Sequence, residues 1–230
     1  MGRPPTISME KLLAVSRRQF AARGYGATTL AGIAGELKVT PAALLRYFPT
    51  KQALFDAAGS HCFCRFWHFA GDNNAWLDRC YNATGENRAE FEAALAAGID
   101  EARGVVAFDD ADGLVGWLKV APAGGMKKLY DRKLYRNLPC FAGDRSGVFV
   151  VGCALVHPAH RHRGVATALV AGAVRIAPIW GARALEAFPR RPKEPVSDDE
   201  LWTGPMGAYE NNGFVEVNDF EPYPVLRRAL

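Results

Sequence analysis

Residues 157–170 of this 230-residue chain read HPAHRHRGVATALV. Three histidines and two arginines precede Gly164, and an apolar run follows it. We expect this basic loop to open a helix and to bind a negatively charged group, because a helix N-terminus leaves backbone N–H groups unpaired and carries the positive end of the helix dipole. The sequence leaves three candidates for that group: nucleic acid, an acidic partner in a metal site, or the phosphates of a small cofactor.

The composition describes an ordinary globular protein, with 49% apolar and 23% charged residues. The longest apolar stretch, around residues 148–156, is far shorter than the roughly 20 residues of a membrane span. Residues 1–13 lack the pattern of a secretory signal. Five scattered cysteines indicate reduced thiols. We therefore expect a cytoplasmic protein with no membrane partner.

The net charge of +4 is unevenly distributed. Residues 1–56 hold eight Lys and Arg against three Asp and Glu, whereas the rest of the chain holds twenty against twenty-one. A basic excess in the first quarter is typical of a nucleic-acid-binding module. The asymmetry predicts two domains, residues 1–58 and 61–230, with a junction near Gly59 and Ser60. An engineered junction at this point remains an alternative.

The first domain is predicted to be a helix-turn-helix unit of three to four helices. Apolar residues recur at helical spacing from residue 9 to Phe20, and Gly24 and Gly26 are predicted to end that helix. Thr28 or Thr29 is suited to cap the next helix. Thr40 is suited to cap a short third helix with Pro41 at its first position. In a helix-turn-helix the second helix of the motif enters the major groove of DNA. A compact helical bundle without DNA binding is the alternative.

The ordered series AARGYGATTLAGIAGELKVTPAALLRYFPTKQALF, residues 21–55, resembles the DNA-binding domain of the TetR family of transcriptional repressors. The resemblance implies double-stranded DNA as a partner. It assigns phosphate contacts to Thr28, Thr40, Tyr47 and Lys51, and groove contacts to Pro41, Ala42 and Arg46. The chain departs from the family pattern at Ala43 and Leu45, where hydroxyl-bearing residues are common.

The second domain is predicted to be α/β. Glycine-punctuated segments rich in Val and aromatic residues predict strands at 104–110, 113–120 and 147–156, with further strands at 182–189 and 213–217. Helices are predicted at 88–98, 166–177 and 204–212. Alternating strands and helices indicate an α/β domain.

Two motifs in this domain resemble the GNAT N-acetyltransferase superfamily. Residues 161–166 form R-x-x-G-x-A, which is similar to the family's pyrophosphate loop, and residues 209–214 form Y-E-x-x-G-F, its second signature. The resemblance covers about residues 61–220. It implies a mixed α/β domain around a central, mostly antiparallel sheet, with acetyl-CoA as cosubstrate. Pyrophosphate binding then falls to the backbone of Arg161, His162, Arg163, Gly164, Val165 and Ala166, and alignment of the pantetheine to Ala154, Leu155 and Val156.

Acetyl transfer to an amine requires a base for the ammonium proton and an acid for the departing thiolate. The resemblance places Tyr209 at the position of the acid; a core aromatic role is the alternative. Glu186 is our candidate base, because a carboxylate flanked by Leu185 and Ala187 on a strand faces away from both. A surface position on the strand is the alternative for Glu186.

The segment HCFCRFWHF, residues 61–69, invites a metal site from His61, Cys62, Cys64 and His68. Cys-x-Cys is shorter than the usual zinc spacing. We therefore predict no metal, and we expect a first strand whose side chains line the acceptor site.

Two functions compete. The first is a GNAT N-acetyltransferase with a DNA-binding module, acting on a small-molecule or peptide amine. The second is a transcriptional regulator whose GNAT-like domain senses acetyl-CoA or a small amine. Because one helix-turn-helix reads only a half-site, we expect a homodimer.

Overall fold

The computed structural model describes residues 7–51, 54, 62–196 and 198–230. The chain divides into two compact units, one comprising Met1–Phe66 and Ala70–Glu92, the other Trp67–Phe69 and Ala93–Leu230. The first unit thus includes residues 70–92, which the predicted division assigned to the second domain. The predicted junction near residues 59 and 60 lies outside the described residues and stays a prediction.

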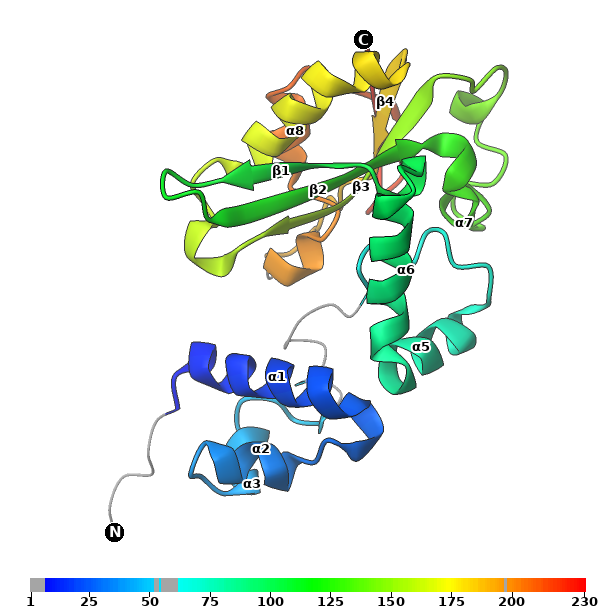
Figure 1. Cartoon of the computed structure of the whole chain (residues 1–230). Helices are drawn as coiled ribbons and strands as arrows, with labels where there is room; N and C mark the ends of the chain where they lie inside the picture. The colour runs from blue at the N-terminus through cyan, green and yellow to red at the C-terminus, as the bar shows by residue number, and fades with distance from the viewer. Residues whose placement is uncertain (1–6, 52–53, 55–61, 197) are drawn as a thin grey trace. The chain divides into compact units, whose positions relative to one another are not determined.

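The first unit is helical, as predicted (Figure 1). Its described helices are α1 (Met9–Ala27), α2 (Leu30–Glu36), α3 (Pro41–Leu45) and α5 (Asn73–Asn82). Helix α1 continues through Gly24 and Gly26, so the predicted end is three residues too early. The core of α1 to α3 consists of Ile7, Leu12, Val15, Phe20, Ile33, Ala34, Leu37, Leu44 and Leu54.

Threonines cap the two short helices. The hydroxyl oxygen of Thr29 accepts the Gly32 N–H (3.0 Å), and that of Thr40 accepts the Ala43 N–H (3.3 Å). Each such cap stabilises a helix by about 1 kcal/mol. Thr28 is fully buried, and its hydroxyl donates to the Gln19 carbonyl (3.1 Å). Thr28 therefore holds the turn between α1 and α2 and does not face outward toward a phosphate.

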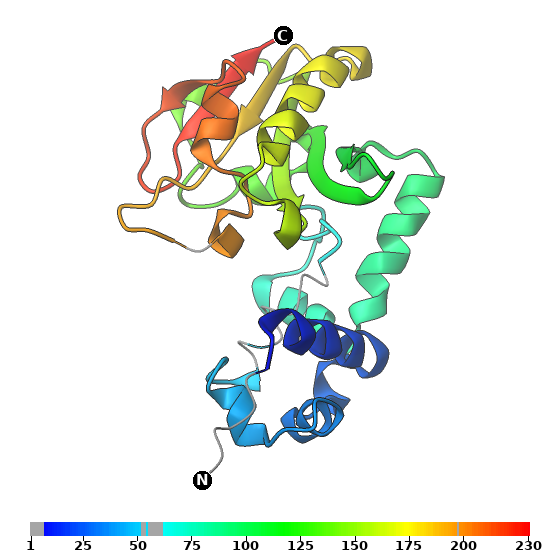
Figure 2. The same ribbon diagram turned by 90° about the vertical axis from the view of Figure 1, so that its left-hand side faces the viewer.

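The second unit contains a six-stranded sheet in the order β1-β2-β3-β4-β6-β5. Its strands are β1 (Gly104–Phe108), β2 (Leu114–Pro122), β3 (Val148–Val156), β4 (Ala184–Ala187), β5 (Val215–Asn218) and β6 (Val225–Ala229). Only β3 and β4 pair in parallel; the other neighbours are antiparallel. The prediction of a mixed α/β domain with a mostly antiparallel sheet is confirmed. Figure 2 shows the C-terminal strands, orange to red, extending the sheet beyond β4.

Helices α7 (Lys127–Tyr130), α8 (Val165–Ile176) and α9 (Met206–Glu210) accompany the sheet, and α6 (Thr84–Ala96) precedes its first strand in the chain. Helix α6 continues from the first unit into the second. Helix α8 packs against β1 and β2 (Figure 1). This approach is close at Gly116, where a Cβ atom would lie 3.0 Å from the side chains of Leu169 and Val165. Short 3-10 turns are η1 (Asp100–Ala102), η2 (Ala123–Gly125), η3 (Pro139–Phe141), η4 (Pro158–His160), η5 (Ala177–Trp180) and η6 (Asp198–Leu201).

One predicted strand does not form, and one strand of the sheet was not predicted. Residues 62–69 form turns and not a strand, since Phe63 (φ 46°) and Cys64 (φ 56°) adopt left-handed backbone that no strand accommodates. Strand β6 was not predicted, because its sequence VLRRA shows no clear alternation. In the part of the chain that is described, no helix has both the length and the apolar content that membrane crossing requires.

Candidate functional site

The two halves of strand β3 have different neighbours, and the second half forms the floor of the candidate site. The first half pairs with β4 only as far as Val151. Between the pairs Val120–Val151 and Leu118–Ala154, β3 contains one residue more than β2, which makes a β-bulge. Beyond the bulge, the Ala154 N–H donates to the carbonyl of Trp202 (2.8 Å), which lies in a loop. The sheet therefore opens between β3 and β4 at this point.

A cavity of about 400 Å³ lies along this open half of β3. Its walls come from β3, from the loop before α8, from the start of α8 and from the segment after η6. The lining residues are Ala154, Leu155, Val156, His160, Arg161, His162, Gly164, Val165, Ala166, Thr167, Asp198, Leu201, Trp202, Gly204 and Pro205. The structure thus brings together all the predicted cofactor residues except Arg163.

The N-terminus of α8 faces this cavity with free backbone donors. Gly164 is the N-cap residue, with left-handed backbone (φ 81°) and no side-chain cap. The first intrahelical bond runs from the Ala168 N–H to the Gly164 carbonyl (2.9 Å). The N–H groups of Val165, Ala166 and Thr167 precede that bond and so have no carbonyl one turn back to accept them. Such an array, at the positive end of a helix dipole, favours a phosphate group.

Basic side chains surround the same helix end. The Arg161 guanidinium donates from Nε to the Val156 carbonyl (3.2 Å), which holds it at the end of β3. Asp198 lies 3.7 Å from Arg161 and 3.0 Å from Nε2 of His162. The carboxylate of Asp198 therefore offsets part of the positive charge beside the start of α8.

Tyr209, the predicted acid, is fully buried in α9. Its hydroxyl donates to the Thr203 carbonyl, in the segment that also carries Trp202. Burial raises the pKa of Tyr209 above its usual value, and the nearby Cys153 thiol raises it further. Tyr209 is therefore protonated at neutral pH. It belongs to the hydrophobic core of this unit and is not among the lining residues of the cavity, which favours the alternative of a core aromatic role.

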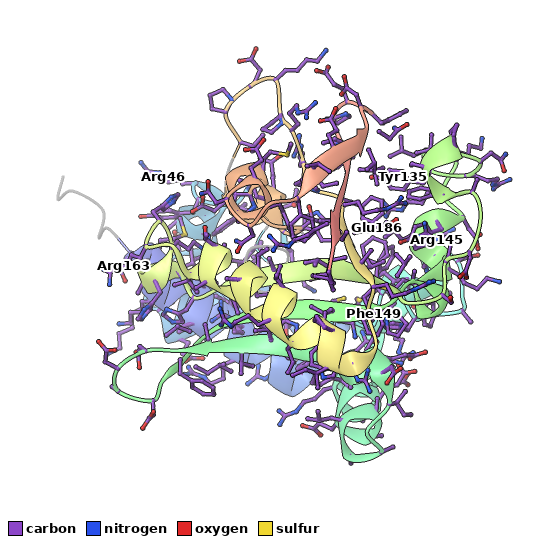
Figure 3. All side chains as sticks on the ribbon, turned by 90° about the horizontal axis from the view of Figure 1, so that it is seen from above. Arg46, Tyr135, Arg145, Phe149, Arg163 and Glu186 are labelled. Carbon is purple, nitrogen blue, oxygen red and sulfur yellow. The ribbon has the colours of Figure 1, made fainter. Side chains whose placement is uncertain are left out.

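Glu186, the predicted base, lies at a different place (Figure 3). It is fully buried on β4, so the alternative of a surface position is wrong. Oε1 accepts from Arg145 (3.0 Å) and from Arg227 (3.0 and 2.6 Å), and Oε2 accepts from Tyr130 (2.6 Å) and Arg145 (2.7 Å). These five hydrogen bonds leave no space for a substrate amine beside the carboxylate.

Figure 3 shows how far these features are separated within the second unit. Arg163 lies exposed at the start of α8, whereas Glu186, Arg145 and Tyr135 gather at the opposite side. Glu186 links α7 to the sheet through Tyr130, and the segment after α7 through Arg145. This geometry favours an anchoring role for Glu186 over proton abstraction.

The candidate DNA-binding residues gather at α3 in the first unit. Thr40, Pro41, Ala42 and Arg46 are exposed, while Tyr47 and Lys51 are half-buried. Burial lowers the pKa of the Lys51 amine. Leu45, which stands where the TetR pattern has a hydroxyl, is 44% exposed and presents an apolar surface there.

His61 lies outside the described residues. His68 is buried, and its Nδ1 lies 2.9 Å from the Gly125 carbonyl. Within the described ranges, no group of three or more His, Cys, Asp or Glu residues is arranged to hold a metal ion.

Two family models match the sequence. The model described as "Acetyltransferase (GNAT) family" matches residues 53–196, and the one described as "Bacterial regulatory proteins, tetR family" matches residues 12–58. The chain belongs to the GNAT acetyltransferase family. Its N-terminal region is a TetR-type helix-turn-helix module, so both suspected resemblances are confirmed. No curated protein shows significant similarity to the sequence.

Solved structures with similar chains include several acetyltransferases. PaiA N-acetyltransferase from Thermoplasma acidophilum, in complex with coenzyme A, is 11% identical, with 100% of each chain covered and a TM-score of 0.41. A GCN5-related N-acetyltransferase from Kribbella flavida is 21% identical over 56% of this chain and 67% of its own, with a TM-score of 0.35. An N-acetyltransferase from Staphylococcus aureus Mu50 is 13% identical over 64% and 76%, with a TM-score of 0.39. The GNAT assignment depends on the family model and not on these distant likenesses.

The sequence did not predict the segment that forms one wall of the cavity along β3. Asp198, Leu201 and Trp202 line this cavity, although they lie between the strand predicted at 182–189 and the helix predicted at 204–212, where no element was predicted. A tryptophan two residues after a run of three acidic residues, 198–200, was the available signal. The hydrogen bond between Ala154 and Trp202, which holds this segment against β3, joins residues 48 apart in sequence. No local sequence pattern predicts such a contact.

Proposed function

We propose that the second unit is an acetyl-CoA-dependent N-acetyltransferase, in which an amine attacks the acetyl group directly. The observation that carries the proposal is the cavity at the start of α8, bounded on one side by the bulged half of β3. Acetyl-CoA, when bound, supplies a thioester whose carbonyl carbon accepts the amine nitrogen.

The residues present fit a diphosphate. A Cβ atom at Gly164 would meet no described atom within 4 Å, so there is open space in front of the backbone. Backbone donors of residues 161–166, with the Arg161 guanidinium beside them, supply the positive potential. The exposed backbone of Ala154, Leu155 and Val156 along the opened sheet is suited to align an extended pantetheine chain.

Tyr209 is our proposed proton donor to the departing thiolate. Its hydroxyl is held at the Thr203 carbonyl and carries its proton at neutral pH. Glu186 is proposed as an anchor that joins β4 to Tyr130, Arg145 and Arg227, in place of its predicted role as base. The ammonium proton then passes to solvent.

A second candidate function is favoured by the exposed start of α3. Thr40, Pro41, Ala42 and Arg46 present an uncovered helix end in a unit that carries a basic excess. We propose that this unit binds duplex DNA, and that the chain does so as a homodimer because one short helix covers a half-site.

Calorimetric titration of the full chain with acetyl-CoA tests the leading proposal. Wild-type protein is expected to bind with a micromolar dissociation constant. Gly164→Glu is expected to lose binding, because its carboxylate places bulk and negative charge in the space where the diphosphate is proposed to bind. Gly181→Glu is the matched control, since Gly181 also has left-handed backbone (φ 89°) with nothing within 4 Å, at the other end of the same helical region. Failure of wild-type protein to bind, or equal losses in both variants, contradicts the proposal.

A further inference from the structure

The outward face of helix α3 combines apolar side chains with one cation. Pro41, Ala42, Leu45 and Arg46 are exposed, and at 3.6 residues per turn they lie within about 140° of the helix circumference. Leu44 is fully buried in the core of the first unit and so fixes which face of α3 turns outward. Leu45 is a large apolar residue, yet it is 44% exposed. This face is therefore exposed and mostly apolar.

The charge around this face fits a polyanion. Residues 37–55 contain three Lys or Arg and no Asp or Glu. Lys38, in the turn between α2 and α3, is exposed. The acidic residue that precedes this stretch, Glu36, is already paired with Arg18. Duplex DNA matches such a surface, because its phosphates flank the base edges that lie in the grooves.

The side chains on this face select among bases. In the major groove, guanine presents two acceptors, O6 and N7, which suit the paired N–H donors of an arginine. Thymine presents a C5 methyl group, which suits an apolar side chain. Adenine is read by Asn or Gln and cytosine by Asp or Glu, and the four residues of this face include none of these. Within the described ranges, no ion pair or side-chain hydrogen bond engages the Arg46 guanidinium, so its donors are available to a base.

We infer that α3 reads a DNA half-site that contains guanine and thymine. Arg46 bonds to O6 and N7 of the guanine, and Leu45 contacts the methyl group of the thymine. The inference rests on the proposed DNA binding. Adjacent Cα atoms are about 3.8 Å apart and base pairs stack about every 3.4 Å, so the two bases lie within about three base pairs of each other. The departure from the TetR pattern at Leu45 thus supplies an apolar base contact in place of a hydroxyl.

Selection of duplexes from a random-sequence pool by the full chain identifies the half-site. We expect the enriched half-site to contain a guanine and a thymine within about three base pairs. A consensus that lacks either base, or binding without enrichment of any sequence, overturns the inference and leaves the proposed DNA binding intact. Absence of binding to every duplex at low salt overturns both.

Single-group changes in the selected duplex test the two contacts separately by fluorescence anisotropy. Deoxyuridine in place of thymidine removes only the methyl group, and it is expected to weaken wild-type binding about three- to fourfold, the effect of exposing one buried methyl group. 7-Deazaguanine in place of guanine removes the N7 acceptor, and it is expected to weaken binding about fivefold or more. Equal affinity for the changed and unchanged duplexes overturns the inference.

Variants assign these losses to single residues. Leu45→Ala is expected to lose its sensitivity to deoxyuridine, and Arg46→Ala its sensitivity to 7-deazaguanine. Met9→Ala is the matched control and is expected to keep both sensitivities, because Met9 is also 44% exposed but lies on α1. Titrations at low salt keep the weaker variants within the measurable range. Losses as large in Leu45→Ala or Arg46→Ala as in wild-type protein overturn the corresponding contact.

Discussion

Replacing Asp198 by Asn is expected to tighten acetyl-CoA binding. In the structure this carboxylate pairs with Arg161 and His162, at the place where the diphosphate is proposed to bind. The Asp198 side chain is 37% exposed and that of Arg161 is 29% exposed, so solvent screens the pair only in part. The ligand must therefore displace or oppose a negative charge.

The size of the effect follows from Coulomb's law. A phosphate charge about 6 Å from the carboxylate, at an effective dielectric constant of about 60, is repelled by about 0.9 kcal/mol. Two such charges give about 1.8 kcal/mol without screening, and salt screening at about 0.15 M reduces the sum to about 1 kcal/mol. This corresponds to acetyl-CoA binding that is about five times tighter in Asp198→Asn, and up to about twenty times tighter at low salt.

The assay is calorimetric titration of both proteins at low and at high salt, with the difference expected to shrink at high salt. Glu200→Gln is the matched control: it makes the same change of charge on the same short turn, but Glu200 pairs with Arg190 (2.6 Å). Unchanged or weaker binding in Asp198→Asn refutes the reasoning, as does an equal gain in Glu200→Gln.

Three further predictions concern other parts of the chain. Tyr209→Phe is expected to lower kcat while leaving acetyl-CoA affinity nearly intact, since the hydroxyl is assigned to proton donation; unchanged turnover in a steady-state assay identifies solvent as the acid. Lys51→Gln is expected to weaken duplex DNA binding and to reduce the slope of log affinity against log salt concentration by about one. Fluorescence anisotropy titrations at several salt concentrations measure this slope, and an unchanged slope contradicts a phosphate contact by Lys51. The pKa of Asp144 is lowered to about 2, first by the backbone N–H and then by the hydroxyl of Ser146, followed by Arg183. Because this value lies below that of the unfolded chain, the stabilisation is present above about pH 4 and is lost as the pH falls toward 2, so the Tm gap between wild type and Asp144→Ala should close over that interval.

Local signals in the sequence predicted much of both units. The caps at Thr29 and Thr40 follow from side-chain chemistry within three residues. The start of α8 follows from the basic loop and the apolar run after Gly164, which predicted a helix at 166–177 where the structure has Val165–Ile176. Such features require no knowledge of distant contacts.

The remaining features depend on contacts between residues far apart in sequence. Glu186 was expected to face away from its apolar neighbours, but β4 lies between β3 and β6 and is covered on both faces, so all three side chains are buried. Its partners Arg145 and Arg227 are each 41 residues away. No pattern around residue 186 reveals them.

The central claim is that this chain transfers acetyl groups from acetyl-CoA to an amine. The most direct measurement is mass spectrometry of a mixture of small amines incubated with acetyl-CoA and the full chain, with Gly164→Glu as a parallel reaction. The account predicts that one amine gains the mass of an acetyl group with wild-type protein and not with the variant. Wild-type protein that binds acetyl-CoA but acetylates nothing contradicts the account and favours a sensing domain joined to the DNA-binding unit.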